Sequence, residues 1–254
     1  MKYEVSILLP GIRNYNWVAL YNSISLSTKR SFELIAVGPY DPPEELVAKD
    51  NFRFFRDFGH PNRCTQIAAT FCDSKYLMWA ADDGVFIENT LDESIDILEE
   101  KNTKNHVVVC NYSEGGNLQQ EHIFKINNAY PSSPYVGENY LIFNVAVMRT
   151  EFYKEVGGID CQFETSALGH ADLAVRSQNY GAEVTLLNKP MLNCTHTPGV
   201  TGDHAPIHFA HTLHDEGLYK LIYSIPESRK RGKISFDTWK NAESIWKRRF
   251  GNRV

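Results

Sequence analysis

Two adjacent carboxylates, Asp82 and Asp83, follow the apolar run YLMWAA and precede a glycine. Neighbouring carboxylates repel each other, and a divalent cation bound between them and an anionic ligand offsets that repulsion. Proteins bind Mg²⁺ or Mn²⁺ in this way, through one or two carboxylates together with phosphate oxygens. The tripeptide DDG is also common in solvated turns. The pair alone therefore leaves two alternatives, a cation site and a turn.

Histidines gather in a second region, where five of them lie between residues 196 and 214. His204, His208 and His211 have the i, i+4, i+7 spacing that places side chains on one face of a helix. This spacing permits metal binding, but the region has neither an HExxH motif nor paired cysteines. A dedicated zinc site is therefore disfavoured.

The segments that must position these residues alternate between short apolar strands and helical patterns. This alternation is typical of βαβ units around a mostly parallel sheet, which makes the fold class α/β. Ligands of such sheets bind at the carboxyl ends of the strands, which is where Asp82 and Asp83 fall. We expect residues 113–137 to form a mobile loop or lid. The expected strands are Val5–Pro10, Phe32–Gly38, Phe52–Asp57, YLMWA, His106–Tyr112, YLIFNVAVMR and AEVTLLN, and the expected helices include Trp17–Ser27, Arg63–Cys72, TLDESIDILEEK and ADLAVRSQNYG.

The composition is that of an ordinary globular protein, with 254 residues, 43% of them hydrophobic and 22% charged. A chain of this length can bury one large core, and we expect one domain over residues 1–225. The net charge of −5 gives no reason to expect nucleic acid as a partner. No apolar run approaches the roughly 18 residues of a membrane span, and the first one is too short for a secretory signal. Five cysteines without a CxxC spacing favour a reduced, cytoplasmic location.

The order of several segments resembles GT-A fold glycosyltransferases, especially family 2. The segments that carry the resemblance are VSILLP, SFELIAVG, RDFGHPNRCTQIAA, YLMWAADDGVFIENTL and EVGGIDCQFETSALGHADLAVRSQNYGAEVTLL. The resemblance implies a nucleotide-sugar-binding half (residues 1–84) and an acceptor half (residues 85–225). It implies a metal-dependent, inverting transfer of a sugar from a UDP-, GDP- or dTDP-linked donor to a hydroxyl of a glycan or lipid-linked acceptor, as in polysaccharide biosynthesis.

The family's aspartate motif, loosely called DXD, corresponds to the carboxylate pair. The resemblance implies that Asp83 holds Mn²⁺ or Mg²⁺ on the diphosphate, while Asp82 approaches the ribose or supports the metal site. It also implies that His196, just after the last core strand, completes the metal site or contacts the diphosphate, with a structural histidine as the alternative. Asp203 and His204 are secondary candidates for this role.

The donor half departs from the family pattern after the second strand, where many members carry an acidic residue that reads the nucleobase. Here only Asp41 is available, slightly late in the sequence. We expect Asp41 to line the nucleotide site together with Pro10, Ile12 and Arg13. Arg63 is expected either to meet a phosphate or the nucleobase, or to be a solvated arginine at a helix start.

The acceptor half departs from the family at the catalytic base, which is usually the aspartate of an acidic pair. Gly169 and His170 stand at that place, and Asp172 follows two residues later. Either His170 or Asp172 could take the acceptor proton, since histidine is an effective general base near neutral pH. A retaining enzyme would need neither of them. Glu164 is expected to shape the acceptor pocket, or to be an exposed loop residue.

Residues 226–254 carry nine Lys or Arg against three Asp or Glu. Helical spacing would place Trp239, Trp246 and Phe250 near one side of a basic helix. Such a helix could contact an anionic membrane surface, where lipid-linked acceptors are found. The alternative is a terminal helix that packs its aromatic residues on the domain. This alternative is favoured, because an apolar stripe on a helix most often faces a core.

Two other functions remain open from the sequence. A nucleotidyltransferase also uses a parallel sheet and an aspartate-bound metal, but it needs a glycine-rich basic loop after the first strand, of which GIRNYNW is a weak version. A catalytically silent module that binds a glycan or nucleotide would explain the absent acidic pair. The intact pair of Asp82 and Asp83 argues against the silent module.

Overall fold

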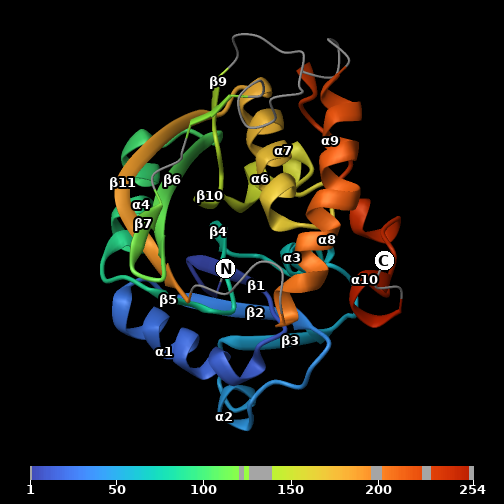
Figure 1. Ribbon diagram of the computed structural model, residues 1–254. Helices are drawn as coiled ribbons and strands as arrows, with labels where there is room; N and C mark the ends of the chain where they lie inside the picture. The colour runs from blue at the N-terminus through green and yellow to red at the C-terminus, as the bar shows by residue number, and fades with distance from the viewer. Residues whose placement is uncertain (1, 120–122, 126–138, 196–201, 225–229, 252–254) are drawn as a thin grey trace.

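The computed structural model describes residues 2–119, 123–125, 139–195, 202–224 and 230–251 (Figure 1). Within these ranges one sheet has nine strands: eight follow the order β3-β2-β1-β4-β10-β6-β11-β5, and the ninth, β7, pairs with β6. Strands β8 and β9 form a separate two-stranded sheet. The strands are β1 (Val5–Pro10), β2 (Phe32–Gly38), β3 (Phe52–Arg56), β4 (Tyr76–Trp79), β5 (Gly84–Phe86), β6 (His106–Glu114), β7 (Asn117–Gln119), β8 (Ile123–Lys125), β9 (Asn139–Leu141), β10 (Val145–Arg149) and β11 (Glu183–Cys194). The helices are α1 (Trp17–Ser27), α2 (Glu44–Val47), α3 (Pro61–Thr70), α4 (Thr90–Lys101), α6 (Thr150–Val156), α7 (Ser166–Asn179), α8 (Ala205–Ala210), α9 (Glu216–Tyr223) and α10 (Lys247–Phe250).

The sheet is parallel through β3, β2, β1 and β4, and again where β11 pairs with β6. Strand β10 runs antiparallel between β4 and β6, and β5 runs antiparallel to the end of β11. Helices α1 and α4 pack on one face of the sheet, and α3, α6 and α7 pack on the other. The α/β class with flanking helices, predicted from the sequence, is confirmed.

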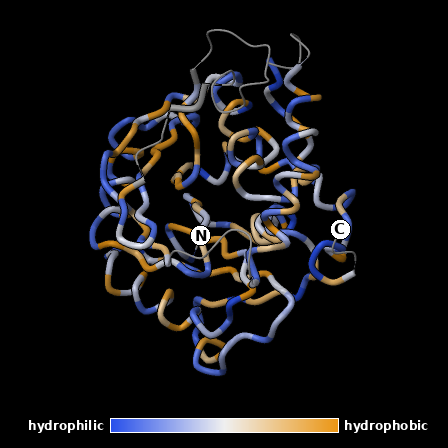
Figure 2. Tube along the Cα trace, viewed as in Figure 1, coloured by the Kyte–Doolittle hydropathy of each residue, from blue (hydrophilic) through white to orange (hydrophobic). Residues whose placement is uncertain are grey.

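The central strands are continuous apolar runs because both of their faces are covered. Along β1, Ile7 and Leu9 face α1, whereas Leu8 faces the α3 side, and all three are fully buried. Figure 2 shows hydrophobic residues along the strands at the centre of the molecule. Hydrophobic burial on two faces therefore holds β1 and its neighbours at the middle of the fold.

Several segments differ from the sequence prediction. Strand β6 extends to Glu114 and is followed by β7, so the start of the predicted loop 113–137 is paired strand. Strand β11 spans twelve residues rather than the short segment AEVTLLN, and it contains register shifts on either side of Pro190. The added length lets the end of β11 reach β5, next to the carboxylate pair.

Two glycines allow close approaches in the walls of the region above the sheet. A Cβ atom on Gly38, at the end of β2, would lie 1.9 Å from the carbonyl oxygen of Gly11, which follows β1. A Cβ atom on Gly169 in α7 would lie 2.2 Å from Nδ2 of Asn62 in α3. Glycine at position 169 therefore allows the close contact of α7 with α3.

Residues 230–251 return across the domain and do not form the basic helix considered from the sequence. They contain only a helical turn at Thr238–Lys240 and the short α10. Phe236 and Trp239 pack on the core beside α3 and α6, and Ile245 forms a β-bridge with Phe58. The aromatic residues thus pack on the domain, as the alternative interpretation held. Of the helices in the described ranges, none is long and apolar enough to cross a membrane.

Gly38→Ala should lower the free energy of unfolding by about 3 kcal/mol, because the new methyl group would collide with backbone that cannot move aside. The matched control is Gly217→Ala in α9, where no atom lies within 4 Å of the added Cβ. This control should raise the free energy of unfolding by up to about 1 kcal/mol, since alanine favours helix over glycine. Urea unfolding of both variants measures the difference, and equal stability of Gly38→Ala and the wild type would contradict the close approach.

Candidate functional site

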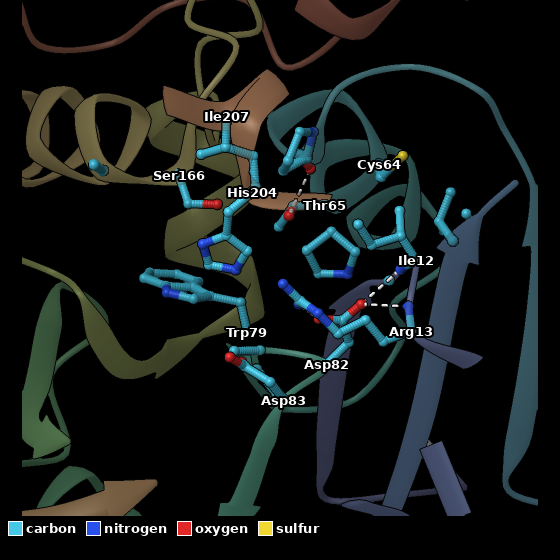
Figure 3. Close-up of a pocket in the computed structure, with 18 of the residues that line it drawn as sticks. Ile12, Arg13, Cys64, Thr65, Trp79, Asp82, Asp83, Ser166, His204 and Ile207 are labelled. Carbon is cyan, nitrogen blue, oxygen red and sulfur yellow. Dashed lines mark hydrogen bonds and ion pairs between the residues drawn. The ribbon is translucent and has the colours of Figure 1, made fainter. Parts of the chain in front are cut away.

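A cavity of about 340 Å³ lies at the carboxyl ends of β1, β2 and β4 (Figure 3). One wall is formed by Pro10, Gly11, Ile12, Val37, Gly38 and Pro39. The opposite wall includes Trp79, Asn144, Ser166, Ala167, His170 and Ile207. Asp82, Asp83, Arg13 and His204 also face this space. The parallel strands thus deliver the carboxylate pair to the edge of the sheet where ligands of α/β proteins bind.

Asp82 is buried and is bound by the chain itself. Its Oδ2 accepts the backbone N–H groups of Ile12, at 2.6 Å, and of Arg13, at 2.8 Å. Its Oδ1 accepts a hydrogen bond from the Arg13 guanidinium. Asp82 therefore ties the end of β4 to the segment that follows β1.

Arg13 connects Asp82 to a segment far along the sequence. Its Nε donates to Oδ2 of Asp203 at 3.1 Å. Burial alone would lower the pKa of Arg13, but the carboxylates of Asp82, Asp83 and Asp203 outweigh it and raise the pKa. The guanidinium therefore stays charged and partly balances three carboxylates.

Asp83 lies on the cavity wall, and its carboxyl group differs from that of Asp82 in its hydrogen bonds. Among the described residues no other side chain forms a hydrogen bond to its carboxyl group, and its backbone carbonyl accepts the N–H of Thr195 at 3.0 Å. Burial raises the pKa of Asp83, the Asp82 charge adds to this effect, and Arg13 opposes it. A cation or hydrogen-bond donor from a ligand would stabilise the ionised form.

His170 lies in α7, one helical turn after Ser166, and both residues line the same wall. Its ring packs against the indole of Trp79, with ring centroids 4.8 Å apart and planes tilted by 33°. Burial lowers the pKa of His170 to about 3. The imidazole is therefore neutral near pH 7 and carries one hydrogen-bond donor and one acceptor.

Asp172, the other predicted base, points away from the cavity and is fully buried. Its carboxylate binds Nε of Arg176 at 2.6 Å, Nη1 of Arg231 at 3.0 Å and the hydroxyl of Tyr223 at 2.6 Å. These three partners occupy the carboxylate in a structural network. Its placement argues against the prediction that Asp172 takes the acceptor proton.

Three further predicted residues lie outside the cavity wall. Asp41 is exposed and pairs with Arg56. Arg63 binds Asp57 at 3.1 Å and donates to backbone carbonyls of the C-terminal segment, so its guanidinium is occupied within the fold. Glu164 accepts hydrogen bonds from Trp246 at 2.9 Å and Arg248 at 3.0 Å, so it positions the C-terminal segment. Asp41 and Arg63 therefore do not line the cavity, whereas Glu164 reaches it through Trp246, which does.

The remaining candidates come from the region after β11. His196 lies outside the described residues. Asp203 and His204 form a helical turn, from which His204 faces the cavity and Asp203 binds Arg13. Within the described ranges, no cluster of three or more His, Cys, Asp or Glu side chains could hold a metal ion. A cation here would therefore need ligands from a substrate as well as from Asp83.

Sequence reasoning missed the contribution of the C-terminal segment to the cavity. Trp246, Arg249 and Phe250 all line it. The aromatic pattern of this segment indicated packing on the domain, but nothing in the sequence indicated where it packs. The contact depends on long-range pairing of Ile245 with Phe58.

Comparisons with known proteins were made at three levels. No protein-family model matches the chain, and no curated protein matches it. Solved structures of S. aureus TarS are similar. TarS 1–349 in complex with UDP-GlcNAc has a TM-score of 0.63 and 14% identity, covering 93% of this chain and 69% of that one. The complex of TarS 1–349 with UDP has a TM-score of 0.58 and 14% identity, covering 87% and 69%.

This likeness establishes the fold. The chain has the GT-A fold that the sequence resemblance implied. It spans 60–69% of the length of the TarS 1–349 structures and 42% of a longer TarS chain, which has a TM-score of 0.58 and 15% identity. At this level of identity the likeness does not extend to activity.

Two of the buried histidines, His60 and His170, predict an acid-sensitive stability. Burial lowers the pKa of His170 to about 3 and that of His60, the residue before α3, to about 4. Between pH 6.5 and 5 the unfolded chain therefore binds more protons than the folded one, and stability is lost as the pH falls. The loss contributed by each histidine should grow from about 0.7 kcal/mol per pH unit at pH 6.5, where the unfolded histidine is half protonated, to about 1.4 kcal/mol per pH unit near pH 5.

Urea unfolding at pH 7, 6 and 5 measures this slope, and these pH values lie above the unperturbed pKa values of Asp and Glu. His170→Gln should reduce the slope by about one proton, because glutamine does not titrate. An identical slope in the wild type and in His170→Gln would contradict the account of a histidine held neutral by burial.

Proposed function

We propose that this chain is a nucleotide-sugar glycosyltransferase that transfers a sugar from a nucleoside-diphosphate donor to an acceptor hydroxyl. The observation that carries the proposal is the Asp83 carboxyl, which faces the cavity at the ends of β1, β2 and β4 while Asp82 is held by the fold. The GT-A fold and the TarS structures with UDP-GlcNAc and UDP support a donor of this kind.

The nucleoside would lie along the wall that follows β1 and β2. Pro10, Ile12 and residues 37–39 supply this wall, whereas Asp41 pairs with Arg56 outside it. Recognition of the base of a UDP-, GDP- or dTDP-linked donor therefore falls to backbone groups and apolar contacts. Arg13 borders the same space and would keep the neighbouring carboxylates ionised.

Mn²⁺ or Mg²⁺ fits the residues that face the cavity. Asp83 would hold the cation, because its carboxyl is partly buried, has a raised pKa, and has no other side-chain partner among the described residues. One protein carboxylate together with phosphate oxygens is an ordinary Mg²⁺ environment. When bound, the cation supplies Lewis-acid stabilisation of the leaving diphosphate.

The acceptor would lie against Trp79, Ser166 and His170. Its hydroxyl oxygen attacks the anomeric carbon, the bond from that carbon to the diphosphate oxygen breaks, and the diphosphate leaves with the electron pair. His170 would accept the hydroxyl proton. In the free protein its pKa of about 3 makes it a weak base, so the bound diphosphate must raise that pKa before transfer. Inversion of configuration follows from this single displacement.

A catalytically silent nucleotide- or glycan-binding module is the second candidate. The observation that favours it is the acceptor wall, whose described residues include no carboxylate that could act as a base. Such a module would bind the donor and release no UDP from it. Release of UDP from a UDP-sugar by the purified protein therefore distinguishes the two functions.

The donor site is tested by thermal denaturation with UDP, GDP or dTDP, with and without Mn²⁺. At a ligand concentration of 100 times Kd, binding stabilises the folded state by about 2.7 kcal/mol, and Tm should rise by roughly 5–10 °C with the preferred nucleotide and Mn²⁺. Asp83→Asn should lose most of this shift, because the amide is a poor ligand for the cation.

Asp73→Asn is the matched control, since Asp73 is exposed and precedes the same strand. It should keep the full wild-type shift. If none of the three nucleotides raises Tm, with or without Mn²⁺, the donor site is not where we place it and the proposal fails.

A further inference from the structure

The C-terminal strap, residues 230–251, forms part of the cavity although it is far from the donor half in sequence. Trp246, Arg249 and Phe250 of the strap line the cavity together with His204 and Ile207. The strap therefore adds a cation and two aromatic rings to the cavity that the carboxylate pair also lines. None of the roles proposed above uses these three side chains.

The first part of the strap is held by side chains of other elements. Nη1 of Arg63 donates to the carbonyls of Trp239 and Ala242. Nε2 of Gln66 donates to the carbonyl of Phe236 at 2.7 Å. The Arg231 guanidinium binds Asp160 at 2.7 Å and also reaches the Asp172 carboxylate. These contacts come from buried groups and fix the path of the strap.

The last turn of the strap is fixed as well. The backbone N–H of Trp246 donates to the carbonyl of Phe58 at 2.8 Å, and its indole N–H donates to Glu164 at 2.9 Å. The ring of Phe250 meets that of Phe58 edge-on, with centroids 5.6 Å apart. Helix α10 is therefore a positioned element of the cavity wall.

Three consecutive basic residues of α10 have different surroundings. Lys247 is exposed and pairs with Glu243, and Arg248 pairs with Glu164. Arg249 faces the cavity, and its Nη1 donates to the backbone carbonyl of Asp203 at 3.2 Å. The Nε atoms of Arg248 and Arg249 are both buried without a partner, but Arg249 differs from Arg248 in forming no ion pair with a described carboxylate. A buried donor of a charged group without a partner is costly, so a ligand that accepts from it would be bound with a gain.

We propose that Arg249 is a specificity-determining residue that binds a phosphoryl group of the substrate. The guanidinium presents several donors in one plane, which matches the oxygens of a phosphate. The contact of Arg249 with Asp203, which in turn binds Arg13, places it on the side of the carboxylate pair. This assignment rests on the proposed function, and the phosphoryl group belongs either to the donor diphosphate or to a phosphorylated acceptor.

The test compares Arg249→Gln with Lys247→Gln, which removes a neighbouring exposed charge from the same turn. Binding is measured by calorimetric titration in the presence of Mn²⁺, with UDP, uridine and inorganic phosphate as probes. Phosphate is titrated into the free protein and, separately, into the UDP-saturated protein. Loss of a charge-assisted hydrogen bond should weaken binding of the phosphoryl group about tenfold or more. Lys247→Gln should bind every probe as the wild type does, and Arg249→Lys should recover part of the loss.

The pattern of loss distinguishes the two sources. If Arg249 binds the donor diphosphate, Arg249→Gln weakens UDP binding and leaves uridine binding unchanged. If it binds a phosphorylated acceptor, UDP binding is unchanged and phosphate binding to the UDP-saturated protein is weakened. Equal binding of all probes by Arg249→Gln and the wild type overturns the assignment. If the wild type binds no UDP, the proposed function fails, and phosphate titration of the free protein alone decides the role of Arg249.

Discussion

The site depends on the hydrogen bonds that the carboxylate of Asp82 accepts. This carboxylate accepts the backbone N–H groups of Ile12 and Arg13 and the Arg13 guanidinium, so it joins the end of β4 to the chain leaving β1. Buried backbone donors without a partner are costly, and this carboxylate satisfies two of them at once. The two strand ends then stay together and form the floor of the cavity.

Adjacent carboxylates can coexist here because their environments differ. The charge of Asp82 is balanced within the fold, whereas Asp83 faces the cavity and depends on a ligand for its balance. The same division appears in α7, where Asp172 is bound in a buried network and His170 faces the cavity. In both places a carboxylate whose partners all come from the protein, Asp82 or Asp172, stabilises the fold. The nearby residue, Asp83 or His170, remains available to a substrate.

The central strands and the position of the carboxylate pair could be predicted from sequence, because continuous apolar runs mark strands buried on both faces. The sequence could not predict which face of α7 is turned toward the cavity. Asp172 is therefore a candidate base from the sequence, although it faces away from the cavity in the structure. The role of Arg249 depends on where the strap packs, which is a long-range contact without a local signal. His196 lies outside the described residues, so its predicted metal contact stays a prediction.

The central claim is that Asp83 is the carboxylate left for a nucleotide-bound cation while Asp82 serves the fold. A crystal structure of the protein with UDP and Mn²⁺ tests it most directly, since anomalous scattering locates the manganese. The account predicts manganese in contact with the Asp83 carboxylate and a diphosphate oxygen, with Asp82 still bound to Ile12 and Arg13. Manganese held without Asp83, or UDP bound outside this cavity, would contradict it.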